Sequence, residues 1–224
     1  MSFVFNHLRV DFDGLNALNI HDLEIPKSKT TWVTGLNGSG KTTFLKVLAG
    51  LITPTAGTLT YNLKELVTRK NYKEYRQKTT MLFQEPYLFR GKVLKNVMYG
   101  LQNQKFTKKE SKLRAMKSME QTGVTDLAKR DSKHLSVGEK KRVALARCIA
   151  IDCEIFLLDE PLSGLDEKSV FQITNLIHKL SQLKKTLIIS SHGIEKFRDK
   201  QDLCIQLKSG EIENSCTEVN QSLE

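Results

Sequence analysis

The sequence has few cysteines, and their spacing matches no known metal-binding or redox motif. Cys148, Cys153, Cys204 and Cys216 include no C-x-x-C pair, and none lies in a Cys/His cluster with zinc-ligand spacing. We therefore expect free thiols in a reducing cytosol, rather than disulfides or a structural zinc site.

Long apolar runs are also missing. No stretch approaches the roughly 20 residues that a membrane-spanning helix needs, and the strongly apolar run 155–158 has only the length of a strand. The first residues have neither a basic start nor an apolar signal segment, so no secretory signal is expected. The sequence shows no internal repeat and no low-complexity tract.

Acidic residues are too few to balance the basic ones. The chain has 35 Lys and Arg against 25 Asp and Glu, which gives a net charge of +10. A basic surface suits nucleic acid, an anionic membrane surface or a small polyanionic ligand, and charge alone does not choose among them. The 224 residues are 39% hydrophobic and 27% charged. This composition can build a core and is unlike that of a disordered chain.

The spacing of apolar residues predicts strands and helices. The predicted secondary structure changes near residue 86 and changes back near residue 152. Between these points the pattern is helical, and outside them it alternates between strands and helices. The elements expected outside the helical stretch are strands at 3–10, 20–25, 30–34, 57–61, 79–83, 155–158 and 186–190, a closing hairpin of 203–207 with 210–213, and helices at 41–49 and 167–183.

One helix of the central stretch has a clear beginning and end. Thr107 and Glu110 form a capping box that opens it, and Gly123 suits its end. Leu113 and Met116 are expected on its buried stripe.

The fold class is therefore α/β. We expect a nucleotide-binding core from 1–85 and 153–216, interrupted by a helical subdomain at 86–152 that carries a further motif described below.

The strongest motif is the glycine-rich loop 35–43, GLNGSGKTT. It matches G-x-x-x-x-G-K-[ST] between a predicted strand and a predicted helix, as its mechanism requires. Glycines let backbone N–H groups approach phosphate oxygens, and the helix adds its positive dipole end. Lys41 is expected to bridge the β- and γ-phosphates, and Thr42 to ligate Mg²⁺. The expected nucleotide contacts in this loop are Asn37, Gly38, Ser39, Gly40, Lys41, Thr42 and Thr43.

Two carboxylates follow the apolar strand 155–158. Because α/β folds bind ligands at the carboxyl ends of their strands, Asp159 is placed to hold Mg²⁺. Glu160 is placed to orient or deprotonate an attacking water. The pair and the glycine-rich loop together have one explanation, which is nucleotide hydrolysis.

A third segment, 135–139, begins a predicted helix. Ser136 and Glu139 form a capping box, and a helix that begins with Ser and Gly can also bind an anion. At this point the residues resemble the Leu-Ser-Gly-Gly-Gln signature of ATP-binding-cassette (ABC) ATPases. Val137 replaces the first glycine of that signature, which leaves Ser136 and Gly138 to meet the nucleotide.

Further residues follow the order of that family. Gln84 resembles the glutamine of the Q-loop, Asp166 lies in a segment similar to the D-loop, and His192 resembles the switch histidine. Phe12 is placed like the aromatic side chain that stacks on adenine. The resemblance covers about residues 3–213.

The resemblance implies a P-loop NTPase with a RecA-like core, an N-terminal antiparallel β region, and ATP and Mg²⁺ as ligands. It also implies a head-to-tail homodimer, in which the glycine-rich loop of one subunit faces Ser136 and Gly138 of the other. The nucleotide contacts that it adds are Phe12, Ser136, Gly138 and Asp166. The implied catalytic residues are Gln84, Glu160 and His192, and the implied metal ligands are Thr42, Gln84 and Asp159.

The stretch 83–101 is similar to importer cassettes, and among these to the tungstate and oxyanion type. This implies an ATP-hydrolysing subunit at the cytoplasmic face of a membrane, with separate transmembrane permease subunits and an extracytoplasmic solute-binding protein as partners. The alternative is a soluble ABC ATPase acting in iron–sulfur assembly or on nucleic acid or ribosomes. A nucleic-acid partner is not expected, because such family members usually carry paired cassettes or long coiled-coil insertions.

Overall fold

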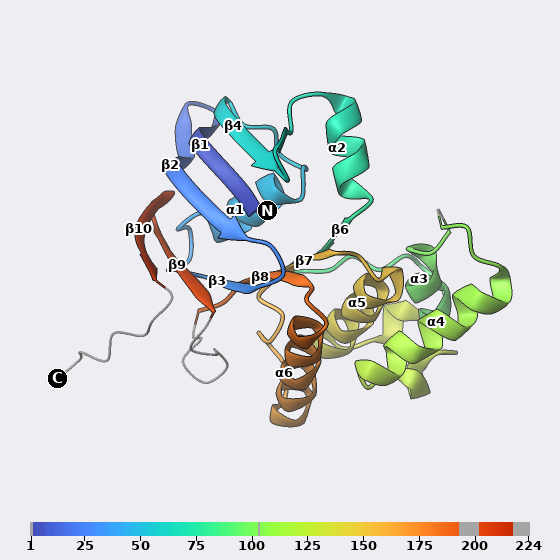
Figure 1. Cartoon of the computed structure of the whole chain (residues 1–224). Helices are drawn as coiled ribbons and strands as arrows, with labels where there is room; N and C mark the ends of the chain where they lie inside the picture. The colour runs from blue at the N-terminus through green and yellow to red at the C-terminus, as the bar shows by residue number, and fades with distance from the viewer. Residues whose placement is uncertain (1, 103, 193–201, 217–224) are drawn as a thin grey trace.

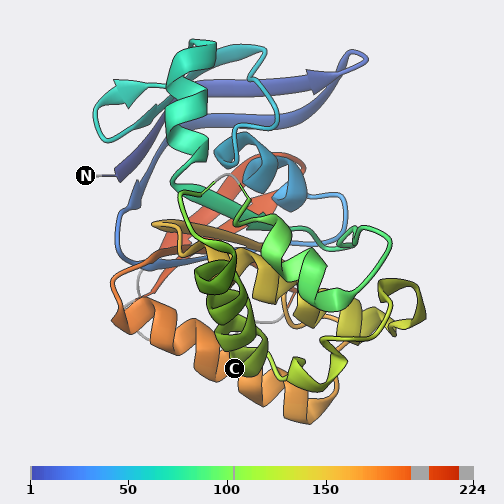
Figure 2. The ribbon, with the colours of Figure 1, turned by 90° about the vertical axis from the view of Figure 1, so that its right-hand side faces the viewer.

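The computed structural model describes residues 2–102, 104–192 and 202–216 of the chain. Its two β-sheets lie one above the other with helix α1 between them (Figure 1). Helices α5 and α6 cover the opposite face of the larger sheet, and α3 and α4 stand to one side (Figures 1 and 2). The chain is thus a layered α/β fold with a separate group of helices.

The smaller sheet is antiparallel throughout and has the strand order β2-β1-β4-β5. Alternate side chains of β1, including Phe3 and Phe5, point into the core, which is the period-2 pattern of a strand with one buried face. Its strands are β1 (Ser2–Phe12), β2 (Leu15–Pro26), β4 (Ala56–Tyr61) and β5 (Lys64–Glu65).

The larger sheet has the order β10-β9-β3-β8-β7-β6 and is parallel except for the β9–β10 hairpin. Every residue of β7 and β8 is buried, as expected for parallel strands covered on both faces. The carboxyl ends of β3, β7 and β8 therefore meet at one edge, where this kind of sheet binds ligands. Its strands are β3 (Thr30–Thr34), β6 (Thr79–Leu82), β7 (Ile155–Asp159), β8 (Thr186–Ser190), β9 (Leu203–Lys208) and β10 (Glu211–Cys216).

Helix α5 belongs to two hydrophobic cores at once. Its Leu145 packs with Trp32 and the helix α6 against the large sheet, while its Val143 packs with α3 and α4 in a second cluster. The helix therefore joins the sheet to the side group of helices. The helices are α1 (Lys41–Leu48), α2 (Arg69–Arg76), α3 (Val93–Tyr99), α4 (Lys108–Gln121), η1 (Thr125–Leu127), η2 (Ser132–His134), α5 (Val137–Ile151) and α6 (Glu167–Gln182).

The predicted fold class is confirmed, as are both predicted capping boxes. The predicted buried stripe of α4 is wrong at Leu113, whose side chain is 70% exposed. Ala115 and Met119 lie on the buried face instead, because that face packs against α3 and α5. Helix α2 was not predicted: it is highly charged, and of its described side chains only Tyr72 and Tyr75 are buried.

Candidate nucleotide-binding and hydrolysis site

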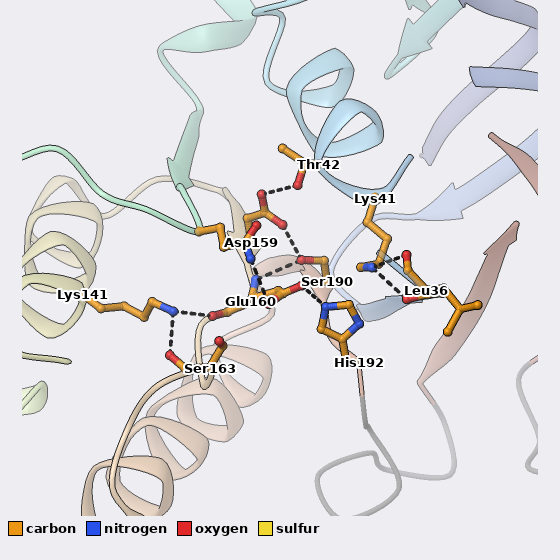
Figure 3. Close-up of polar contacts among 11 residues, drawn as sticks. Leu36, Lys41, Thr42, Lys141, Asp159, Glu160, Ser163, Ser190 and His192 are labelled. Atoms are coloured by element: carbon orange, nitrogen blue, oxygen red, sulfur yellow. Dashed lines mark hydrogen bonds and ion pairs between the residues drawn. The ribbon is translucent and has the colours of Figure 1, made fainter. Parts of the chain in front are cut away.

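The glycine-rich loop leaves the carboxyl end of β3 and leads into α1. A Cβ atom on Gly35 would lie 2.2 Å from the carbonyl oxygen of Leu207, and Gly40 has a φ of 102°, so both positions need glycine. The Lys41 ammonium donates to the carbonyl oxygens of Gly35 (2.8 Å) and Leu36 (3.0 Å), as Figure 3 shows. Burial lowers the pKa of Lys41, and the negative charges of nearby carboxylates act against this shift.

The loop also offers polar groups that are free to bind a ligand. The Ser39 hydroxyl is buried, and it has no hydrogen-bond partner within the described part of the chain. Because buried polar atoms are normally paired, such a hydroxyl inside a phosphate-type loop fits a phosphate oxygen. Asn37 and Gly38 lie at the exposed tip of the loop, and Thr43 lies on the first turn of α1.

Oxygen ligands suitable for Mg²⁺ meet at the start of α1 and the end of β7. The Thr42 hydroxyl donates to Asp159 Oδ2 at 2.8 Å. Ser190, at the end of β8, donates to the other oxygen of the same carboxylate at 2.6 Å. Mg²⁺ prefers hard oxygen ligands and is usually held by one or two carboxylates together with substrate phosphates. The donor set therefore fits this ion, although Gln84 presents its amide nitrogen to Glu160 in this structure.

The Glu160 carboxylate is buried and is held from two sides. Gln84 Nε2 donates to its Oε2 atom at 3.3 Å, and His192 Nε2 lies 2.5 Å from Oε1. These residues come from the end of β7, the segment after β6 and the segment after β8. The arrangement fixes a carboxylate beside the Asp159 and Thr42 oxygens (Figure 3).

The signature segment lies apart from these groups. Ser136 caps α5 reciprocally with Glu139, and Val137 is 72% exposed. A Cβ atom on Gly138 would meet Leu165, so this turn rests on the segment after Glu160. Among the described residues, no hydrogen bond or ion pair joins Ser136 or Gly138 to the glycine-rich loop.

Two predicted nucleotide contacts lie at the border of the site. Phe12 is half exposed at the end of β1, opposite Leu15, and the neighbouring Ala17 approaches the loop at Gly40. Asp166 is the N-cap of α6, because its carboxylate accepts from the backbone and the hydroxyl of Ser169. These hydrogen bonds lower the pKa of Asp166.

Sequence reasoning missed two residues that touch the site. Ser190 was included only as the end of a strand. Lys141 was one of many lysines, yet it lies four residues before Leu145 and therefore on the buried face of α5. A charged residue on an apolar helix stripe was the available signal.

This geometry defines a P-loop ATPase. A family profile described as "ABC transporter" matches residues 18–163, and the chain belongs to that family. It is 33% identical over 202 residues to the energy-coupling factor transporter ATP-binding protein EcfA of Carboxydothermus hydrogenoformans, a match that covers 89% of this chain and 74% of that protein. The chain is therefore an ATPase, and it is the ATP-binding subunit of an ABC transporter.

Solved structures agree on the fold. A structure of cbiO1 from Clostridium perfringens, described as part of the ABC transporter complex cbiONQ, matches with a TM-score of 0.82 at 28% identity, covering 96% of this chain and 88% of that one. The cassette MJ0796, in a dimeric post-hydrolysis state with ADP and Pi, matches with a TM-score of 0.86 at 26% identity, covering 96% and 97%.

Proposed function

We propose that the chain drives import across a membrane, as one of two identical ATPase subunits docked on separate permease subunits at the cytoplasmic face. The observation that carries the catalytic part is the buried Glu160 carboxylate, held between Gln84 and His192 beside Asp159. In the part of the chain that the structure describes, no helix has the length and apolar character to cross a membrane. Permease subunits supply the membrane path in this proposal.

Glu160 is the general base of the proposed reaction. It accepts a proton from the water that attacks the γ-phosphorus, while Gln84 and His192 keep its carboxylate oriented. Thr42 and Asp159 would hold Mg²⁺, which when bound neutralises charge on the β- and γ-phosphates. Lys41 leaves the loop carbonyls that it binds here and donates to the phosphates instead.

Each ATP site is shared between two subunits in this proposal. The signature end of α5 is capped by its own residues and its Val137 is exposed, so Ser136 and Gly138 are free to face a second copy. The structural relative MJ0796 is dimeric with ADP and Pi bound. Closure on ATP and reopening after phosphate release follow, because the signature helix end attracts the γ-phosphate.

An aromatic surface beside Gln84 is the proposed docking site for the permease. Tyr87 and Phe89 meet edge to face at 5.5 Å, and Phe89 packs on Tyr99 at 4.2 Å. All three rings are exposed, and Tyr87 shows 70% of its surface. Arg147 supports this cluster by donating to the Tyr87 carbonyl at 3.0 Å. Exposed aromatic residues of this kind are enriched in protein interfaces.

We further propose that residues 86–152 move as one unit with this surface, so that Gln84 links nucleotide state to the permease. An extracytoplasmic solute-binding protein would complete the proposed set of partners. The tungstate prediction rests on the stretch 83–101 alone, and the names of the relatives do not support it. They also do not favour the alternative of a soluble ATPase in iron–sulfur assembly or on nucleic acid or ribosomes.

Affinity capture from detergent-solubilised membranes tests this function. The tagged chain should retain a multi-span membrane protein, identified by mass spectrometry and confirmed by reciprocal capture. Tyr87→Ser should lose the partner while ATP binding stays intact. Leu113→Ser, a second exposed apolar side chain on α4, is the matched control and should retain it. Retention of the partner by the Tyr87 variant, or reciprocal capture of a soluble complex only, would contradict the proposal.

A further inference from the structure

Lys141 carries a buried positive charge between α5 and the turn that follows β7. The residue lies on the second turn of α5 and is only 4% exposed. Its ammonium donates to the carbonyl oxygen of Ser163 at 2.7 Å and to that of Glu160 at 3.1 Å (Figure 3). A buried ammonium is costly unless it is well paired, so these two hydrogen bonds define where the side chain ends.

Both acceptors belong to one turn, which follows the catalytic strand β7. The backbone N–H of Ser163 donates to the Glu160 carbonyl at 3.3 Å and closes the turn. The Lys141 ammonium therefore spans the first and last carbonyls of this turn. It ties the turn to the helix that begins with the signature segment.

Glu160 itself has a backbone conformation that needs support. Its φ is 48°, in the left-handed region that costs a side-chain-bearing residue about 1–2 kcal/mol. Such residues persist where the surrounding structure over-determines them. Here the Ser190 hydroxyl accepts from the Glu160 N–H at 2.9 Å, and Lys141 holds the carbonyl on the other side of the residue.

We propose that Lys141 is a positioning residue, which holds Glu160 in this left-handed conformation and so aims its carboxylate at Gln84 and His192. This inference rests on the proposed role of Glu160 as the general base. It also gives the signature helix a direct link to the catalytic turn of its own subunit. A shift of α5 on meeting the partner subunit's nucleotide is passed to Glu160 through the ammonium.

The electrostatic surroundings are consistent with a charged side chain. Burial lowers the pKa of Lys141, while the negative charges of Glu160 and Asp159 act to raise it. The carboxylates thus help to keep the ammonium protonated where it is needed.

The test compares Lys141→Met with Lys140→Met in steady-state hydrolysis and in nucleotide titration. Methionine keeps the apolar stem of Lys141 and removes its donors. We expect kcat to fall about 10-fold or more, because small displacements of a catalytic group cost up to about 100-fold. The ATP dissociation constant should stay unchanged. Lys140, the next residue on the same helix, loses the same charge and should hydrolyse ATP like the wild type.

A double variant separates positioning from general damage. If Lys141 acts through Glu160, then Lys141→Met should have no further effect on the residual hydrolysis of Glu160→Gln. Lys141→Gln keeps two N–H donors on a shorter side chain, and it replaces Lys141→Met in the same test if the methionine variant does not fold. Its kcat should fall less, and its effect should also vanish beside Glu160→Gln.

Three results would overturn the inference: wild-type kcat in Lys141→Met, a parallel loss of ATP affinity, or an equal loss of kcat in the Glu160→Gln background. Failure of the proposed function is a different result, because Glu160→Gln alone would then hydrolyse ATP normally.

Discussion

The catalytic turn at 159–163 and the signature segment at 135–139 are supported in opposite ways. Around the catalytic turn, polar groups are paired with side chains from other elements, including Thr42, Ser190 and Lys141. The signature segment is satisfied by its own capping box and by an ion pair from Glu139 to Arg130. The first region is therefore completed within the chain, whereas the second presents a finished helix end to the outside.

The exposure of each region matches its role in the site. A helix end that is capped locally needs nothing from its own subunit, so it can face a ligand held by another. A catalytic carboxylate, in contrast, needs fixed neighbours, because misplacement is costly. Substitutions at the catalytic turn should therefore lower turnover, whereas substitutions at the signature segment should alter dimer closure.

Glu160→Gln should have the largest effect on turnover. The amide cannot accept a proton from water, so kcat should fall by about 100-fold or more, which is typical for loss of a general base. ATP binding should persist, and the variant should accumulate as an ATP-bound dimer. Single-turnover hydrolysis and size-exclusion chromatography with ATP check these outcomes, and turnover like that of the wild type would remove Glu160 from its role.

Lys41→Ala should act on affinity. Loss of charge-assisted hydrogen bonds of about 1.5–3 kcal/mol should weaken ATP binding by about 10- to 100-fold. The fold should survive, because the partners that Lys41 leaves behind are carbonyls at the rim of an exposed loop. A fluorescent-nucleotide titration and a circular-dichroism melt measure the two effects. An unchanged titration would contradict the expected role of Lys41.

Ser190→Ala should cost stability and activity together. The Glu160 N–H loses its acceptor and Asp159 loses a donor, so unfolding free energy should fall by about 1–3 kcal/mol. Thr174→Val is the matched control, because the Thr174 hydroxyl is buried without a partner among the described residues. Denaturant titration should show a larger loss of unfolding free energy for Ser190→Ala than for Thr174→Val. Equal losses would show that the Ser190 hydrogen bonds do not stabilise the fold.

Val137→Gly should have the smallest effect, and it should act on dimer closure. The exposed isopropyl group limits how closely the helix end approaches a nucleotide. Its removal should raise the ATP-dependent dimer fraction of Glu160→Gln protein, with a slight loss of melting temperature from added chain entropy. Equal dimer fractions across an ATP titration would show that the valine has no influence on closure.

Local signals made much of the site predictable. The glycine-rich loop, the Asp159–Glu160 pair after an apolar strand, and the Ser136–Glu139 box each lie within a few residues, so their chemistry can be read from spacing. Helix α2 escaped prediction because Tyr72 and Tyr75 are the only large apolar side chains among its charged residues, and Leu113 was misplaced because α5 sets the packed face of α4.

The support of the catalytic turn could not be predicted in the same way. Ser190 and Lys141 reach Glu160 from positions 30 and 19 residues away in the chain. Their contacts depend on how β7, β8 and α5 pack together, and no spacing rule covers such a meeting. Asp166 differs, because its carboxylate caps α6 through Ser169, only three residues along the chain.

The measurement that tests the shared site most directly is complementation between two impaired subunits. Lys41→Ala removes the loop lysine, and Ser136→Glu places a negative charge where the signature meets the γ-phosphate. In a head-to-tail dimer of one chain of each kind, one site pairs both defects and the other pairs an intact loop with an intact signature. Mixing the two proteins at an ATP concentration too low to fill the Lys41→Ala loop should therefore restore up to about a quarter of wild-type hydrolysis, because half of randomly formed dimers are mixed and each has one sound site. Activity of the mixture no greater than the sum of the separate variants would contradict a site built from two chains.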